Sequence, residues 1–173
     1  MAAFKRTSQN LNIGATIELV DGTPDFTSVT LPLSSLDREI FVVTDIQMEY
    51  DPIPLPQAVG NNVTLLASVN KVTESFTSIN NPDCIGSMQV KAGIPVTGVE
   101  AVVQSSRSPD EMSSGTISDY INIIATPNYV LAGSYASTAG GLPNRSVFIR
   151  LTGYRAVASA DVYAALVTEE LNS

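Results

Sequence analysis

The residues able to carry acid–base or nucleophilic chemistry are limited first by an absence, because the 173-residue sequence contains no histidine. Histidine is the general base of Ser-His-Asp and Cys-His hydrolases, the commonest metal ligand and the usual proton shuttle near neutral pH. The composition therefore argues against those hydrolases and against zinc sites built on imidazole.

One nucleophile motif is present. Ser68-Val-Asn-Lys71 matches the S-x-x-K pattern of penicillin-interacting serine enzymes, in which a lysine amine lies within reach of the serine hydroxyl on a helix. Here the motif falls in a predicted strand, where residues i and i+3 point to opposite faces. The partner motifs K-T-G and S-D-N are missing, so we interpret Ser68 and Lys71 as structural residues.

Carboxylates could form acid–base pairs or a calcium site. The candidates are Asp45 with Glu49, Asp110 with Glu111, and Asp119 with Glu169-Glu170. The D-x-D-x-D-G spacing of a calcium loop is absent, and solvated faces and loops explain the pairs.

The glycines form no dinucleotide-binding or Walker loop. Gly140-Gly141 is followed by Leu-Pro-Asn, whereas a Walker loop continues with Lys and Ser or Thr. We predict no catalytic, cofactor-binding or metal-binding residues, and no enzymatic activity.

The charge balance bears on partners. Nine basic and 17 acidic residues give a formal net charge of −8, which repels phosphate backbones and anionic membranes. Lys5-Arg6 is the only basic pair and is too small to neutralise several phosphates. The sequence thus predicts no direct sequence-specific binding of nucleic acid. Arg145, Arg150 and Arg155 are expected to pair with carboxylates of this chain or of a neighbouring subunit.

Compartment and membrane association follow from cysteine content and apolar runs. Cys84 is the only cysteine, so no intramolecular disulfide can form and an oxidising compartment is not required. No apolar stretch of signal-peptide length follows the basic pair Lys5-Arg6, and no apolar run approaches the 18 residues of a transmembrane helix. We expect a chain made in the cytoplasm, without membrane insertion.

The pattern along the chain predicts strands. Residues 1–12 are polar and lack periodicity, which indicates a flexible N-terminal arm ahead of one domain, 13–173. In 39–50, Val42, Thr44, Ile46, Met48 and Tyr50 are expected on one face. The other predicted strands cover 13–20, 63–73, 86–90, 96–104, 117–125, 128–135 and 146–157. Residues 29–33 are expected at an edge or in a loop, 51–56 as a connector, 105–115 as an exposed loop, and 139–144 as a turn.

The fold class follows from these elements. About eight short strands with no helices between them predict an all-β antiparallel sandwich and disfavour an α/β fold. The end of the chain, 160–171, is ambiguous between period two and helical spacing, and we favour a short C-terminal helix on its Val162–Leu166 and Tyr163–Val167 pairs.

Three segments carry a resemblance over about a third of the chain. They are Leu36-Asp-Arg-Glu-Ile-Phe-Val-Val-Thr-Asp-Ile46, Ser146-Val-Phe-Ile-Arg-Leu-Thr-Gly-Tyr-Arg-Ala-Val157 and Ala160-Asp-Val-Tyr-Ala-Ala-Leu166. They resemble the first and last strands of small single jelly-roll coat proteins of icosahedral viruses infecting microbes. The resemblance implies a capsid subunit of the virion that associates with copies of itself and with other virion proteins through its sheet edges and terminal arm. Coat proteins that package single-stranded genomes against their inner wall commonly carry a basic arm, and the arm of this chain has only Lys5-Arg6.

A second function remains open on the residues alone. A carbohydrate-binding or adhesin-type β-sandwich would need exposed aromatic side chains, and this chain has no tryptophan. Tyr120, Tyr129 and Tyr135 are the candidates for such a platform.

Overall fold

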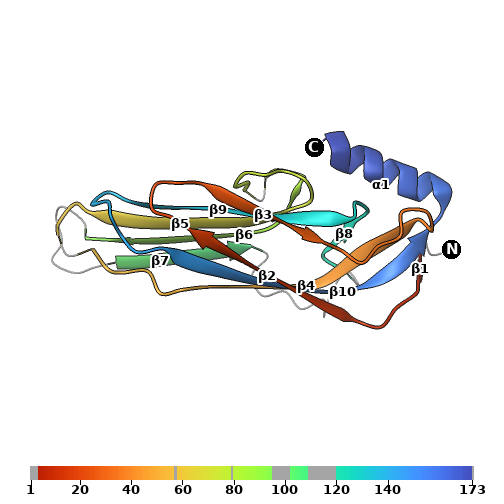
Figure 1. Cartoon of the computed structure of the whole chain (residues 1–173), viewed down its shortest axis with the longest axis horizontal. Coiled ribbons are helices and arrows are strands. Elements are labelled where there is room, and N and C mark those ends of the chain that lie inside the picture. Colours follow the sequence, from red (N-terminus) through yellow and green to blue (C-terminus); the bar gives the residue numbers. More distant parts are fainter. Residues whose placement is uncertain (1–3, 57, 79, 95–101, 109–119, 173) are drawn as a thin grey trace.

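The structure, a computed structural model, describes residues 4–56, 58–78, 80–94, 102–108 and 120–172. Over these residues the chain forms two antiparallel sheets and one C-terminal helix (Figure 1), which confirms the predicted all-β sandwich. The elements are β1 (Phe4–Arg6), β2 (Leu11–Leu19), β3 (Asp25–Thr30), β4 (Glu39–Tyr50), β5 (Asn62–Asn70), β6 (Cys84–Gly93), β7 (Val102–Ser108), β8 (Asn122–Ile124), β9 (Asn128–Ser137), β10 (Arg145–Ala158) and α1 (Ala160–Asn172).

The strand order defines two layers. The first sheet runs β1-β10-β4-β8, with β2 also paired to β10, and the second runs β3-β9-β5-β6-β7. The first half of the chain pairs with the second half in nested order: β2 with β10, β3 with β9, β4 with β8 and β5 with β6. One long antiparallel hairpin has thus been wrapped into a two-sheet barrel, which is the topology of a single jelly roll.

Apolar residues of both sheets meet between the layers. Phe41, Leu65, Leu131, Tyr135 and Leu151 are among the fully buried side chains of this main core. Alternation along each strand directs them inward, as expected for stacked sheets with one solvated face each.

A β-bulge changes the phase of β4. Thr152 pairs with Asp45 while Gly153 pairs with Val43, so no residue of β10 lies opposite Thr44 in the register and β4 gains one residue. Val43 and Ile46 therefore both face the main core, whereas Val42 faces the opposite side. The prediction that Val42 shares a face with Ile46 is wrong, because uniform period-two alternation does not continue through the bulge.

A second, smaller core lies on the outer face of the first sheet. Helix α1 covers this end of the sheet beside the N-terminal strand (Figure 1). Val162, Tyr163, Leu166 and Val167 of the helix pack against Ile40, Val42, Ala156 and Ala158. The predicted C-terminal helix is confirmed, and it buries an apolar patch that the bulge creates.

Two boundaries differ from the sequence-based expectation. Residues 4–6 pair with β10, and β2 begins at Leu11, so these parts of the expected arm are strands of the first sheet. Residues 105–108, expected in a loop, complete β7 because they pair with β6. The remainder of the expected loop, 109–115, and the starts of the strands expected at 96–104 and 117–125 lie outside the described residues.

Among the described residues, no helix has the length and hydropathy of a membrane span.

Candidate functional site

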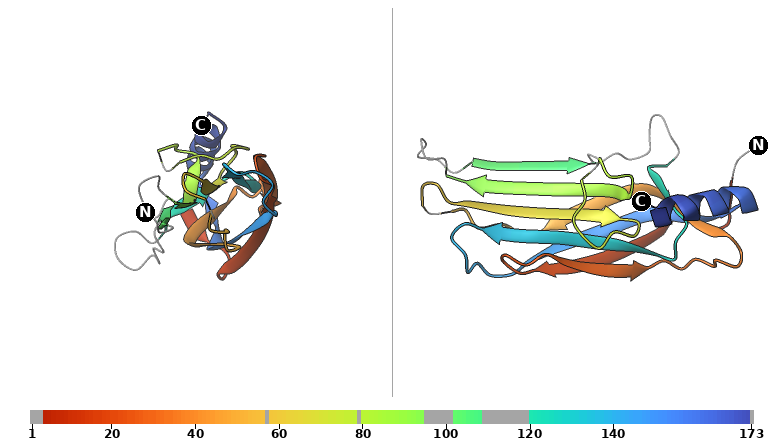
Figure 2. Two further views of the ribbon diagram at one scale, coloured as in Figure 1. Left: turned by 90° about the vertical axis from the view of Figure 1, so that its left-hand side faces the viewer. Right: turned by 90° about the horizontal axis from the view of Figure 1, so that it is seen from above.

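A buried polar cluster lies where β5 ends, and it contains the S-x-x-K motif. The Thr77 backbone N–H donates to Ser68 Oγ at 3.0 Å, and Thr77 Oγ1 donates to Asn70 Oδ1 at 2.5 Å. Asn70 Nδ2 donates to the carbonyl oxygens of Thr73 and Ser75 at 2.8 and 2.7 Å. These bonds fold the β5–β6 connection back over the second sheet (Figure 2, right). Ser68 is therefore a hydrogen-bond acceptor for a loop.

Asp83 completes this cluster from the other end of the connection. Its carboxylate is fully buried and accepts the backbone N–H groups of Val72 and Thr73 at 2.9 and 2.8 Å. The Lys71 backbone N–H donates to the Asp83 carbonyl oxygen at 3.0 Å. Backbone donors thus satisfy the carboxylate, as burial of a charged group requires. The interpretation of Ser68 and Lys71 as structural agrees with these contacts.

Cys84 lies beside this cluster and is poorly suited to be a nucleophile. Burial raises the pKa of its thiol above 9.0. Hydrogen bonds with Thr77 and Gly86 lower this pKa in part, and the nearby Asp83 carboxylate makes a smaller contribution that raises it. A reactive cysteine needs the opposite environment, one that stabilises the thiolate.

Among the carboxylates considered for acid–base or calcium chemistry, those in the described residues are dispersed. Asp45 and Glu49 share one face of β4 but are separated by four strand residues, about 13 Å, which is wider than the spacing in glycoside hydrolases. Glu169 is exposed while Glu170 is buried. Within the described segments, no group of three metal-ligating side chains occurs. Asp110, Glu111 and Asp119 lie outside them.

Glu170 has a role that the sequence reasoning missed. Its side chain is 1% exposed and accepts the backbone N–H groups of Ala125 and Thr126 at 2.8 and 2.9 Å. The carboxylate therefore attaches the end of α1 to the β8–β9 turn. Its spacing from Leu166 and Val167, four and three residues, was the available signal, because it places Glu170 on the apolar face of the helix.

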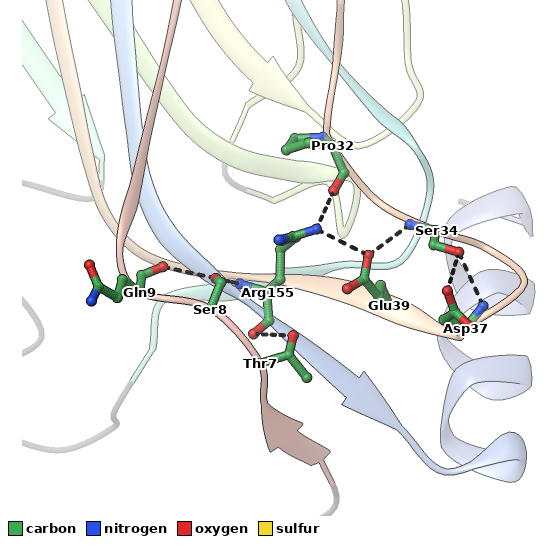
Figure 3. A network of polar contacts seen from close by, with 8 residues as sticks. All are labelled: Thr7, Ser8, Gln9, Pro32, Ser34, Asp37, Glu39 and Arg155. Carbon is green, nitrogen blue, oxygen red and sulfur yellow. Dashed lines mark hydrogen bonds and ion pairs between the residues drawn. The ribbon is translucent and has the colours of Figure 1, made fainter.

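The three arginines near the end of the chain have separate partners. Arg155 forms an ion pair with Glu39 at 3.6 Å and donates to the Pro32 carbonyl oxygen at 3.4 Å, inside the network of Figure 3. Arg150 donates to Gln47 at 3.4 Å on the outer face, and Arg145 donates to the Asn144 carbonyl oxygen. The expected pairing with a carboxylate of this chain is confirmed for Arg155.

The N-terminal basic pair is partly engaged in the fold. Arg6 lies 4.4 Å from the ring centre of Tyr154 and donates to the Ser8 carbonyl oxygen and to Asn10 Oδ1, each at 2.7 Å. Ser8 in turn accepts the Arg155 backbone N–H at 2.8 Å (Figure 3). The guanidinium of Arg6 therefore fixes the segment between β1 and β2.

The tyrosines proposed as a sugar platform are in the wrong places for one. Tyr129 and Tyr135 have no exposed surface and belong to the main core. Tyr120 is half-buried against Phe4, with ring centres 5.9 Å apart, at the edge of the second core. That prediction is wrong for Tyr129 and Tyr135, because inward alternation along β9 buries both rings.

The hollows in the described surface are shallow. One lies on the first sheet among β2, β4 and β10, and two lie on the second sheet. Lys91, Val102 and Gln104 line one beside β7, and Gln89, Ser105 and Ser106 contribute to another. Their lining has hydroxyl, amide and apolar groups with one amine.

Comparisons with known proteins were made by sequence and by structure. No family model matches the chain, and no curated protein matches it. Among solved structures, a chain of Desmodium yellow mottle tymovirus is similar at 12% sequence identity, over 88% of this chain and 84% of that one, with a TM-score of 0.31.

Proposed function

We propose that this chain is a structural protein of a virion, a capsid subunit that assembles with copies of itself and with other virion proteins. It acts through its surfaces and catalyses no reaction. The observation that carries the proposal is the nested pairing of β2 with β10, β3 with β9, β4 with β8 and β5 with β6. Jelly rolls of this order serve as capsid proteins, lectins and cupins.

The residues favour the first of these three uses. A metal site of the usual imidazole type is unsupported, because the sequence has no histidine. A lectin needs exposed aromatic rings, and two of the three candidate tyrosines are buried. The buried polar groups of the β5–β6 connection are directed at the chain's own backbone. These features support a building block over an enzyme or a sugar-binding module, which stays the second candidate.

The proposed subunit does not bind the genome directly. A net charge of −8 repels nucleic acid, and the Arg6 guanidinium is engaged with Tyr154 and Asn10. Synthesis in the host cytoplasm and incorporation into the virion complete the proposal.

The test is the association state of the purified chain. Sedimentation velocity over a hundredfold range of concentration, with electron microscopy of the heaviest fraction, should show oligomers or closed particles. A glycan array probed with the same preparation measures the rival function. A chain that stays monomeric throughout would overturn the capsid proposal, and glycan binding by that monomer would support the rival function.

A further inference from the structure

Negative charge is distributed unevenly over the two sheets. The chain carries 17 carboxylates, yet β5, β6, β7 and β9 contain no aspartate or glutamate. In the first sheet, by contrast, the outer positions of β2 and β4 include Glu18, Asp45 and Glu49. Two copies that each carry a net charge of −8 repel one another least where carboxylates are absent. Interface centres are likewise depleted of aspartate and glutamate.

β7 is the outermost strand of this carboxylate-free region (Figure 2, right). Among the described residues, it pairs with β6 only, so the hydrogen-bonding groups of its other side face outward. The five side chains from Val102 to Ser106 are all exposed. Val102 and Val103 are 47% and 53% exposed, and as neighbours in a strand they point to opposite faces of the sheet.

From Val102 to Ser106 the edge lacks the features that usually prevent edge-to-edge pairing, and the one charged residue of β7, Arg107, comes after this run. Natural sheets protect their edges with proline, charged side chains or bulges. The run Val102-Val-Gln-Ser-Ser106 contains no proline and no charge, and its pairing with β6 is continuous from Val102 to Ser108. Backbone groups on such an edge gain hydrogen bonds when a second strand docks.

We propose that two copies of this chain pair through β7, antiparallel and across a two-fold axis perpendicular to the second sheet. This inference rests on the proposed function and names the contact by which the subunits first associate. The pairing joins two five-stranded sheets into one continuous sheet, and the same strand serves both partners, as in any two-fold interface.

The topology favours this contact over pairing of β7 with β3 of the next copy. The five strands alternate in direction, so β3 and β7 run the same way. Copies related by rotation about an axis along the strands would therefore bring β7 and β3 together in parallel, the less stable arrangement. The two-fold arrangement makes β7 antiparallel to its counterpart.

A register centred on Gln104 fits the exposed run. It places Gln104 opposite Gln104 of the partner subunit, Val103 opposite Ser105 of the partner subunit, and Val102 opposite Ser106 of the partner subunit. These pairs contain no like charges, and they cover both exposed valines. Such cross-strand pairs stabilise a sheet when they are apolar or hydrogen-bonded.

The experiment compares two chemically identical substitutions in the full chain. Gln104→Glu places a carboxylate at the centre of β7, close to the same carboxylate of the partner subunit. Gln47→Glu adds the same charge on the outer face of the first sheet, where Arg150 already donates to Gln47. Sedimentation equilibrium measures the dimer Kd of each variant, and circular dichroism confirms that each is folded.

We expect Gln104→Glu to raise the dimer Kd at least about tenfold and Gln47→Glu to leave it within about twofold. Salt at 1 M shortens the screening length to about 3 Å and should recover much of the loss in the first variant. If the wild-type chain dimerises and the two variants have equal dimer Kd values, the β7 contact is overturned and the capsid proposal still stands. Wild type that never associates overturns both.

A second pair of variants tests the apolar contribution without a charge. Val102→Ser removes an exposed valine from β7, and Val20→Ser removes one of nearly equal exposure, 46%, directly after the end of β2. Weakened association in Val102→Ser alone supports the contact. An equal effect of both substitutions contradicts it.

Discussion

Gly153 in β10 lies directly against Val42 in β4, at the point where the register of the two strands shifts. A β carbon at residue 153 would overlap the Val42 carbonyl oxygen and would lie 2.8 Å from Cε1 of Phe41. The shift allows Phe41 and Val43 to enter the main core while Ile40 and Val42 enter the second core. The close approach of the β4 and β10 backbones at Gly153 therefore permits the register shift by which β4 supplies side chains to both cores.

We predict that Gly153→Ala destabilises the fold by about 1–3 kcal/mol, the usual cost of forcing extra volume into a packed site. The obstacle is a backbone oxygen and a buried ring, neither of which can move away freely. Denaturant titration followed by circular dichroism measures the free energy of unfolding.

The matched control is Gly14→Ala in β2. A β carbon there would meet only the Ile149 carbonyl oxygen at 3.7 Å, an ordinary contact. Its effect should stay within about 1 kcal/mol and should favour the folded state, since glycine weakens a strand. Equal destabilisation by both substitutions would contradict the role assigned to Gly153.

Glu170→Ala is predicted to release the end of α1. The backbone N–H groups of Ala125 and Thr126 would lose their acceptor, at a cost of about 1–3 kcal/mol for each buried donor left unpaired. Hydrogen exchange followed by mass spectrometry should show faster exchange in 160–172 and 125–126, with the strands of the second sheet unchanged.

Glu169→Ala is the control for this prediction, because Glu169 is exposed on the same helix. Both substitutions remove one carboxylate near the helix end. Only Glu170→Ala should loosen the helix, and equal exchange in the two variants would show that the buried carboxylate does not hold α1.

Most of the long strands and the terminal helix could be predicted from the sequence, because alternation and i,i+4 pairs are local signals. β1 and the end of β7 were expected as arm and loop, because their strand character depends on pairing with β10 and β6. The extended connector at 51–56 followed equally from its prolines. The phase change at Thr44 could not be predicted in this way. It depends on the pairing of β4 with a strand about a hundred residues later, where Gly153 allows the close approach.

The same distinction between local signals and distant pairing applies to the polar contacts. The interpretation of Ser68 and Lys71 as structural residues used local strand geometry, since residues i and i+3 of a strand point to opposite faces. In the structure β5 ends at Asn70, before Lys71. The acceptor role of Ser68 toward Thr77, and that of Glu170 toward Thr126, depend on which backbone segment lies opposite. Likewise, the burial of Tyr129 and Tyr135 depends on which face of β9 turns inward, which the tertiary fold decides.

Alkylation of Cys84 should be slow in the folded chain. Burial raises its pKa above 9.0, so at pH 8 the thiolate fraction is smaller than in the unfolded chain. We predict that iodoacetamide modifies the native protein at least about tenfold more slowly than the protein in denaturant, as followed by mass spectrometry. Equal rates would show that the thiol is neither buried nor held protonated.

Tyr129 should make the fold sensitive to alkaline pH. Burial raises the pKa of its phenol far above the ordinary value of 10.0, and its hydroxyl has no hydrogen-bond partner within the described structure. Above pH 10 the unfolded chain releases this proton while the folded chain keeps it, so the unfolded state is favoured as pH rises. The free energy of unfolding should fall by about 1.4 kcal/mol per pH unit from this group.

Tyr129→Phe should reduce the slope of the unfolding free energy against pH by that amount between pH 10 and 11.5. Tyr163→Phe, at a half-buried position of α1, serves as the control. An unchanged slope in Tyr129→Phe would mean that the phenol ionises equally in both states.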